Sequence, residues 1–318
     1  MLATELVAGL ALLVLGGDVL VRGSVGLAER MNISPLLIGI VLVGFGTSTP
    51  ELMTSLIAAL NGSAGIAVGN VVGSNTANIL LILGIAALIY PLRADPRALM
   101  RDGLVMTLAA LACLALGAFG TIDRVSGVLL LLALAIYLLV TYRAERGTHT
   151  PSAEMHRAES QAVTAHPWTR SYPALVVMAL SGLGLTMLGA KWLVGASVEL
   201  AQQFGISETI IGLTIVAVGT SLPELVTSVI AALKRQPDIA FGNILGSNIY
   251  NVLGILGFTA LVKPIDVPEQ IMRFDVWVML AATILLLIFA RTGKQICRIE
   301  GGLLLGAYAL YVGKLALS

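Results

Sequence analysis

The chain has few of the side chains that soluble proteins place on their surfaces. Of its 318 residues only 12% are charged and 5% are aromatic, and the formal net charge is +1 at pH 7. The basic residues stand at the ends of apolar segments, so we expect no face for nucleic acid. The two cysteines, Cys113 and Cys297, lie in or beside apolar segments and suggest no disulfide framework.

The chain has only three histidines. His149, His156 and His166 all lie in the only long hydrophilic stretch, residues 143–170, whose composition is typical of a flexible linker. A regulatory metal site there is the alternative. The apolar segments contain no histidine, and no lysine stands where it could activate Ser48 or Ser221 as a nucleophile. We therefore expect no enzyme, and a membrane-embedded hydrolase is a remote alternative.

What the chain has in abundance is apolar sequence, with 57% hydrophobic residues and a mean hydropathy of +0.94. Segments of about 20 apolar residues, enough to cross a bilayer, follow one another along most of its length. We predict an all-α polytopic membrane protein with ten transmembrane helices, at roughly 3–27, 33–60, 65–90, 99–119, 123–142, 172–200, 205–233, 239–262, 271–290 and 297–316.

The distribution of lysine and arginine predicts the orientation. With the N-terminus outside, 14 basic residues fall on the cytoplasmic side and four on the external side. This bias agrees with the positive-inside rule. We expect a multi-pass protein of the plasma (inner) membrane, with both termini outside and the linker 143–170 in the cytoplasm.

The predicted helices divide into two equal halves. Residues 1–142 and 171–318 each hold five spans, and an odd number makes the second half thread the membrane in the opposite sense. We therefore predict two inverted five-helix repeats, an architecture typical of secondary transporters, which bind their substrate near the midplane.

The two halves share a motif. Residues 44–84 and 217–257 align without a gap at an offset of 173, and 24 of the 41 positions are identical. Because lipid penalises polar residues, shared Glu, Asn, Pro and Ser within apolar segments indicate a site built from two matching halves. The shared polar pairs include Thr47/Thr220, Ser48/Ser221, Pro50/Pro223, Glu51/Glu224, Ser74/Ser247, Asn75/Asn248 and Asn78/Asn251.

The spacing of these residues indicates how they cooperate. Thr47 and Ser48 lie one helical turn before Glu51 and share its face. Pro50 lacks an N–H, so we expect a broken helix that presents hydroxyls, a carboxylate and backbone carbonyls at one depth. The second half repeats this with Thr220, Ser221, Pro223 and Glu224, and Ser74/Asn78 and Ser247/Asn251 add oxygens at i, i+4.

All of these side chains offer oxygen, and none offers sulfur or imidazole. Oxygen ligands suit hard cations such as Ca²⁺ and Na⁺, and Ca²⁺ takes 6–8 of them in flexible geometry. Glu51 and Glu224 supply two negative charges, which one Ca²⁺ or two Na⁺ would neutralise. A site whose charge can be neutralised by one Ca²⁺ or by two Na⁺ is a basis for exchange of these ions. For the shared glycines and for Asn70, Asn75 and their mates, helix packing is an equally good interpretation.

The duplicated motifs resemble the α-repeats of the cation/calcium exchanger superfamily, in its prokaryotic sodium/calcium exchanger branch. The matching segments are GFGTSTPE (44–51), GNVVGSNTAN (69–78), AVGTSLPE (217–224) and GNILGSNIYN (242–251). The resemblance implies antiport of Ca²⁺ against Na⁺ by alternating access, without a cofactor, and with inorganic cations and lipid as the only partners evident. It implies a cation site of Glu51, Glu224, Thr47, Ser48, Thr220, Ser221, Ser74, Asn78, Ser247 and Asn251, with the backbone carbonyls of Gly44 and Ala217.

One position departs from the family pattern. Many sodium/calcium exchangers carry Asp where this chain has Asn251, so coupling ratio and K⁺ dependence do not carry over. Exchange of Ca²⁺ for H⁺, or K⁺-dependent exchange, at the same site is therefore an alternative, because paired glutamates can also carry protons. A channel is a further alternative.

Overall fold

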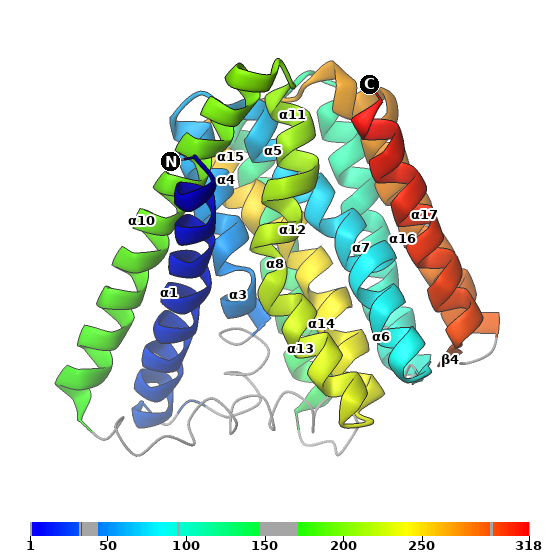
Figure 1. Cartoon of the computed structure of the whole chain (residues 1–318). Coiled ribbons are helices and arrows are strands. Elements are labelled where there is room, and N and C mark those ends of the chain that lie inside the picture. Colours follow the sequence, from blue (N-terminus) through cyan, green and yellow to red (C-terminus); the bar gives the residue numbers. More distant parts are fainter. Residues whose placement is uncertain are drawn as a thin grey trace.

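The computed structural model is a bundle of long helices (Figure 1) and describes residues 2–31, 33, 44–93, 96–146, 171–292 and 295–317. The three histidines lie outside the described residues, so the linker stays a prediction. With η for a π-helix, the first half comprises α1 (Leu2–Arg30), α3 (Gly44–Thr47), α4 (Thr49–Leu60), α5 (Ala64–Ala77), η2 (Asn78–Ile82), α6 (Leu83–Ile89), β1 (Leu92–Arg93), α7 (Pro96–Gly117), β2 (Thr121–Ile122) and α8 (Arg124–Glu145). The second half comprises α10 (Tyr172–Phe204), α11 (Glu208–Ile211), η3 (Gly212–Val216), α12 (Ala217–Thr220), α13 (Leu222–Leu233), α14 (Pro237–Ile249), η4 (Tyr250–Leu256), α15 (Gly257–Val262), β3 (Ile265–Asp266), η5 (Ile271–Asp275), α16 (Val276–Thr292), β4 (Gln295–Ile296) and α17 (Arg298–Ala316).

The prediction of a helical membrane protein is confirmed. Within the described ranges, seven helices are long and apolar enough to cross a membrane, and the bent pair 208–220 and 222–233 would make an eighth. Part of the predicted second span, residues 34–43, lies outside the described residues, and α17 covers the predicted tenth. The count of ten therefore stays a prediction.

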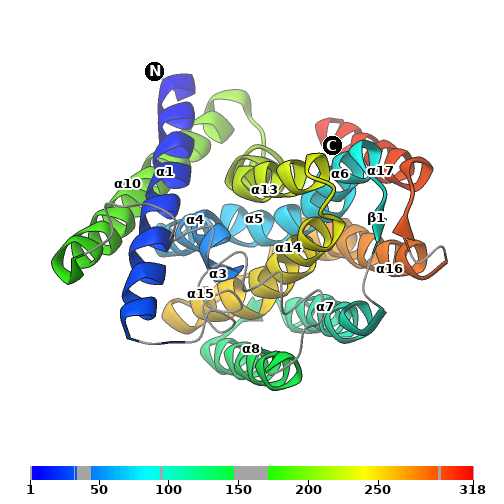
Figure 2. The same ribbon diagram turned by 90° about the horizontal axis from the view of Figure 1, so that it is seen from below.

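The two spans richest in Gly and Asn form the centre of the bundle. The helices from α5 to α6 and from α14 to α15 are largely buried, and Figure 2 shows α5 and α14 in the middle, with other helices around them. Small residues allow close approach: a Cβ added to Gly73 would lie 2.6 Å from the Leu213 carbonyl oxygen, and one on Gly69 would lie 3.0 Å from that of Thr209. At these glycines the packing interpretation is confirmed.

The first helices of the two halves pack against each other in opposite directions. In Figure 1, α1 and α10 lie side by side, and both chain ends lie at the same end of the bundle. Gly9 faces Gly189 and Gly16 faces Gly182, and an added Cβ on any of the four would lie 3.0 Å or less from the facing carbonyl oxygen. Because Gly9 is the repeat mate of Gly182 and Gly16 that of Gly189, the contact follows the two-fold relation of an inverted repeat.

The last helix of each half packs on the other half. α8 contacts α15, where a Cβ on Gly127 would lie 2.7 Å from the Gly257 carbonyl oxygen. α17 contacts α6 in the same manner, with a Cβ on Gly301 lying 2.9 Å from the Gly84 carbonyl oxygen. The two halves are therefore interlocked.

Two short antiparallel ladders also join the halves. β1 pairs with β4, and β2 pairs with β3. Because β1 precedes α7 and β2 follows it, the ladders lie at opposite ends of this helix. Each ladder binds a loop of one half to a loop of the other.

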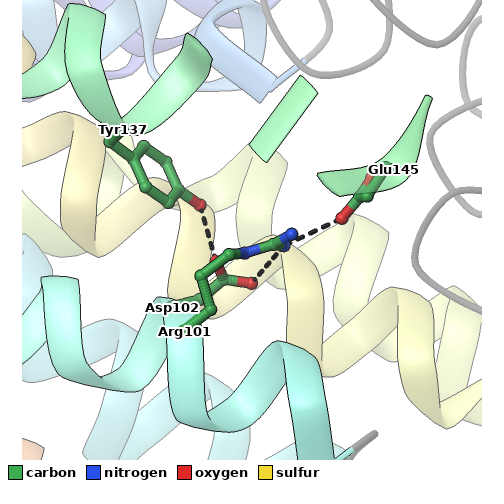
Figure 3. Close-up of polar contacts among 4 residues, drawn as sticks. All are labelled: Arg101, Asp102, Tyr137 and Glu145. Atoms are coloured by element: carbon green, nitrogen blue, oxygen red, sulfur yellow. Dashed lines mark hydrogen bonds and ion pairs between the residues drawn. The ribbon is translucent and has the colours of Figure 1, made fainter. Parts of the chain in front are cut away.

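A partly buried ion cluster links α7 to α8 (Figure 3). The Tyr137 hydroxyl donates to Asp102 Oδ1 at 3.2 Å, and Arg101 Nε donates to the same oxygen at 2.6 Å. Arg101 Nη2 also donates to Glu145 Oε1 at 2.8 Å. The guanidinium thus places a positive charge beside two buried carboxylates.

The second half repeats the Asp–Tyr pair. Asp275, the mate of Asp102 at the offset of 173, accepts a hydrogen bond from the Tyr311 hydroxyl at 3.0 Å. Here the nearby cation is Lys314, whose Nζ lies 2.9 Å from the centroid of the Phe274 ring. In each half, a Tyr–Asp hydrogen bond therefore joins the last two long helical segments. The basic side chain near this bond is an arginine in the first half and a lysine in the second.

Candidate cation site

Both predicted broken helices are broken at a serine. Ser48 separates α3 from α4 with φ −86° and ψ 10°, and Ser221 separates α12 from α13 with φ −81° and ψ 12°. The second break bends the chain by 48°. Pro50 and Pro223 stand in the first turn of the new helix, where a missing N–H costs little. Each break thereby places a hydroxyl and, three residues later, a glutamate at the start of a helix.

The two glutamates meet across the repeat axis. The Ser221 hydroxyl donates to Glu51 Oε1 at 2.9 Å, and the Ser48 hydroxyl donates to Glu224 Oε1 at 3.2 Å. All four residues are buried. Each carboxylate therefore accepts a hydrogen bond from the serine of the opposite repeat, so both halves contribute residues to this candidate site.

Other predicted ligands surround this pair. The Ser247 hydroxyl donates to Glu224 Oε1 at 3.4 Å. Its mate Ser74 instead donates to the Ala217 carbonyl at 3.3 Å, and the Thr220 hydroxyl approaches the same carbonyl at 3.3 Å. The hydroxyl of Thr47 is buried and has no partner among the described residues. These contacts place the Ala217 carbonyl and the hydroxyls of Ser74, Thr220 and Ser247 near the serine–glutamate pairs.

The remaining predicted ligands do not contact a glutamate within the described residues. Asn251 Nδ2 donates to Asn75 Oδ1 at 2.9 Å. Both amide atoms of Asn78 are buried without a partner in the described ranges. Gly44 is the first residue of α3, three residues before Thr47.

Two asparagines that the sequence left open between packing and function brace the glutamate-bearing turns. Asn70 Nδ2 donates to the Glu51 carbonyl at 3.1 Å and to the Ser55 hydroxyl at 2.9 Å. Its mate Asn243 makes the same two bonds, to the Glu224 carbonyl at 3.3 Å and to the Ser228 hydroxyl at 3.0 Å.

Asn70 also accepts a hydrogen bond at its Oδ1 from the Thr220 hydroxyl, at 3.0 Å. Sequence reasoning missed Ser55 and Ser228, although both are identical between the repeats and lie one turn after a glutamate.

The backbone near the site departs from regular α-helix. η2 begins at Asn78, η3 ends just before Ala217, and η4 contains Asn251. A π-helical turn shifts the register of side chains and occurs often at functional sites. Here it lies beside predicted ligands in both repeats.

The unpaired oxygens fit a hard cation. Glu51 Oε2, Glu224 Oε2, Thr47 Oγ1, Asn78 Oδ1 and Asn251 Oδ1 are buried without a donor among the described residues. Buried oxygens without donors are costly unless something positive approaches them. In the described ranges, no group of three or more His, Cys, Asp and Glu side chains could hold a metal ion. The candidate site consists instead of two carboxylates and neutral oxygens.

Comparison with known proteins gives consistent matches. The model of the sodium/calcium exchanger protein family matches residues 2–143 and 174–315. The putative antiporter CaxA of Alkalimonas amylolytica is 39% identical over 307 residues, covering 95% of each chain. The sodium/calcium exchanger MaX1 of Methanosarcina acetivorans is 33% identical, covering 96% of each.

A solved structure also resembles the structure of this chain. The sodium-calcium exchanger NCX_Mj, soaked with Na⁺ and Ca²⁺, matches with a TM-score of 0.65 and 31% identity, covering 98% of this chain and 97% of that one.

Proposed function

Because this chain belongs to the sodium/calcium exchanger family, we propose that it exchanges Ca²⁺ for Na⁺ across the membrane by alternating access. It is a membrane transporter of cations and not an enzyme. The observation that carries the proposal is the reciprocal contact between the repeats, in which Ser221 holds Glu51 and Ser48 holds Glu224. A pocket shared by two inverted halves can be opened to either side in turn.

In this proposal Glu51 and Glu224 are the principal ligands, because their two charges balance one Ca²⁺ or two Na⁺. Neutral oxygens complete the coordination: the side chains of Thr47, Ser48, Thr220, Ser221, Ser74, Asn78, Ser247 and Asn251 and the carbonyls of Gly44 and Ala217. The unpaired buried oxygens support this assignment.

The helices that move would be α1 and α10. They pack closely on each other along Gly9, Gly16, Gly182 and Gly189, and α1 lies over both breaks. A Cβ on Gly46 would overlap the Val21 side chain, and one on Gly219 would lie 2.6 Å from Leu10. A pair that touches both broken helices is placed to open one half of the site while it closes the other.

Flux measurement tests the coupling. We expect ⁴⁵Ca²⁺ uptake into proteoliposomes that are loaded with Na⁺, driven by the outward Na⁺ gradient. Imposing K⁺ and H⁺ gradients separately distinguishes the alternatives. Equal Ca²⁺ uptake without Na⁺, or uptake driven by a pH gradient alone, would contradict Na⁺ coupling and favour Ca²⁺/H⁺ exchange.

A further inference from the structure

Four buried asparagines at the centre of the bundle break the two-fold symmetry of the site. Asn75 on α5 and Asn78 at the start of η2 are the repeat mates of Asn248 on α14 and Asn251 in η4. A symmetric arrangement would give each pair the same contacts. The structure instead gives hydrogen-bond partners to Asn75 and to the amide nitrogen of Asn251, and leaves both amide atoms of Asn248 and of Asn78 without partners in the described ranges.

The satisfied arrangement is centred on Asn75. Its Nδ2 donates to the backbone carbonyl of Asn248 at 3.3 Å and approaches Met279 Sδ at 3.7 Å. Because a carbonyl can only accept, this contact fixes the amide orientation, and Asn75 Oδ1 must then accept. It accepts from Asn251 Nδ2 at 2.9 Å. Asn75 therefore holds Asn251, a proposed cation ligand.

The mate arrangement is absent from the described residues. By symmetry, Asn248 Nδ2 would donate to the Asn75 carbonyl and approach Met106, the mate of Met279, while Asn248 Oδ1 would accept from Asn78 Nδ2. Both side chains are buried, and the two amide atoms of Asn248 and of Asn78 have no partner among the residues that the structure describes.

A bound cation would not remove this asymmetry. It can satisfy Asn78 Oδ1, but the amide nitrogens of Asn78 and Asn248 are donors and need an acceptor. The symmetric acceptors for these two nitrogens already exist in the chain, as the Asn248 side-chain oxygen and the Asn75 carbonyl. A conformation that exchanges the roles of the two repeats would bring donor and acceptor together.

We propose that Asn75 and Asn248 are positioning residues that alternate during transport. In the present conformation Asn75 holds Asn251 and leaves Asn78 unheld; in the opposite-facing conformation Asn248, supported by Met106, holds Asn78 and Asn251 is unheld. The proposal rests on the proposed function only in requiring that the protein alternates between two states. It makes Asn75 stabilise one state and Asn248 the other.

Opposite effects on the two membrane faces test this. Removing the stabilising contact of one state shifts the population toward the other. We expect Asn75→Ala to change the ratio of external to cytoplasmic KM for Ca²⁺, in oriented proteoliposomes, by at least about fivefold, because the variant loses two neutral hydrogen bonds and one alone is worth about that factor. Asn248→Ala should change the ratio by a similar factor in the opposite direction, and the double variant should restore it.

Milder variants cover the case in which the alanine variants fail to fold. Met279→Leu and Met106→Leu keep the apolar volume and remove the sulfur contact, so they should give smaller shifts of opposite sign. Thr76→Val serves as the control, because the Thr76 hydroxyl donates to Val72 within its own helix and should not affect the ratio.

The possible outcomes distinguish the positioning role from a purely structural role. Shifts of the same sign, or no shift, for the members of either pair would overturn the proposal, because a purely structural role moves both faces alike. If Ca²⁺ proves to be coupled to H⁺, the same KM ratio is measured with a proton gradient. Failure of Na⁺ coupling is thereby distinguished from failure of the positioning role.

Discussion

At the scale of single residues, the structure assigns two kinds of work to duplicated polar side chains. Glu51 and Glu224 each keep one buried carboxylate oxygen without a partner among the described residues, whereas Asn70 and Asn243 donate to the backbone carbonyls of those glutamates. We propose that the glutamates bind the cation and that the asparagines fix the position of the backbone. Substitutions can separate them.

Replacing either glutamate by glutamine should abolish exchange. Glu51→Gln and Glu224→Gln keep the size of the side chain and remove one of the two charges facing the cation. Even at an effective dielectric constant of ~20, one unit pair at 4 Å is worth about 4 kcal/mol, so Ca²⁺ uptake should fall by at least about 100-fold. Normal elution on gel filtration would show that folding is retained, and substantial flux in either variant would contradict the role.

The bracing asparagines should affect stability, and unequally. Asn70→Ala removes bonds to Glu51, Ser55 and Thr220 at a buried position, whereas Asn243→Ala removes two bonds at a partly buried one. Orphaned buried groups cost roughly 1–3 kcal/mol. Thermal unfolding in detergent should show a larger loss for Asn70→Ala, with the exposed Gln203→Ala as control. Equal losses would mean that the Thr220 bond contributes nothing.

At the scale of elements, local sequence pattern predicted the broken helices and the apolar helices that the structure describes, and the duplication predicted that the two motifs come together. The contacts that join α7 to α8, and the two strand ladders, were missed. The breaks at Ser48 and Ser221 result from the neighbouring prolines and glycines, and the helical spans result from apolar length. The bond between Tyr137 and Asp102 joins residues 35 positions apart on different helices, and the ladders pair segments of only two residues. Neither carries a signal in a single sequence.

Close packing of α1 on α10 gives a prediction at this scale. A Cβ on Gly182 would overlap the backbone nitrogen of Leu20, whereas Gly184, on the same helix, has nothing within 4 Å. We expect Gly182→Ala to lower stability by about 1–3 kcal/mol through overpacking. Gly184→Ala should be neutral or slightly stabilising.

This difference in stability is tested by measuring the unfolding temperatures of the two variants under the same conditions. An equal effect of the two substitutions would show that the helices separate without cost. Flux through Gly182→Ala would show in addition whether the close contact is needed for transport.

At the scale of the whole molecule, the charge distribution predicts how the bundle sits in the membrane. The two chain ends lie at the same end of the bundle, on opposite sides of it, and α10 begins near the other end (Figure 1). From the excess of basic residues we predict that the linker side faces the cytoplasm.

Labelling in intact cells tests this orientation. In a background with Cys113 and Cys297 replaced by serine, Ser318→Cys should react with a membrane-impermeant maleimide from outside. Ser160→Cys, in the linker, should react only after the cells are permeabilised. The reverse pattern would invert the predicted topology.

The interlocking of the last helices constrains how the protein is made. Gly127 on α8 has its packing partner at Gly257, far later in the chain, so the first half leaves the ribosome with an unfilled surface on its final helix. Assembly must wait until α15 has been inserted. The same crossing leaves the last helix of each predicted half without its packing surface until the other half is present, so we expect neither half to fold stably when it is expressed alone.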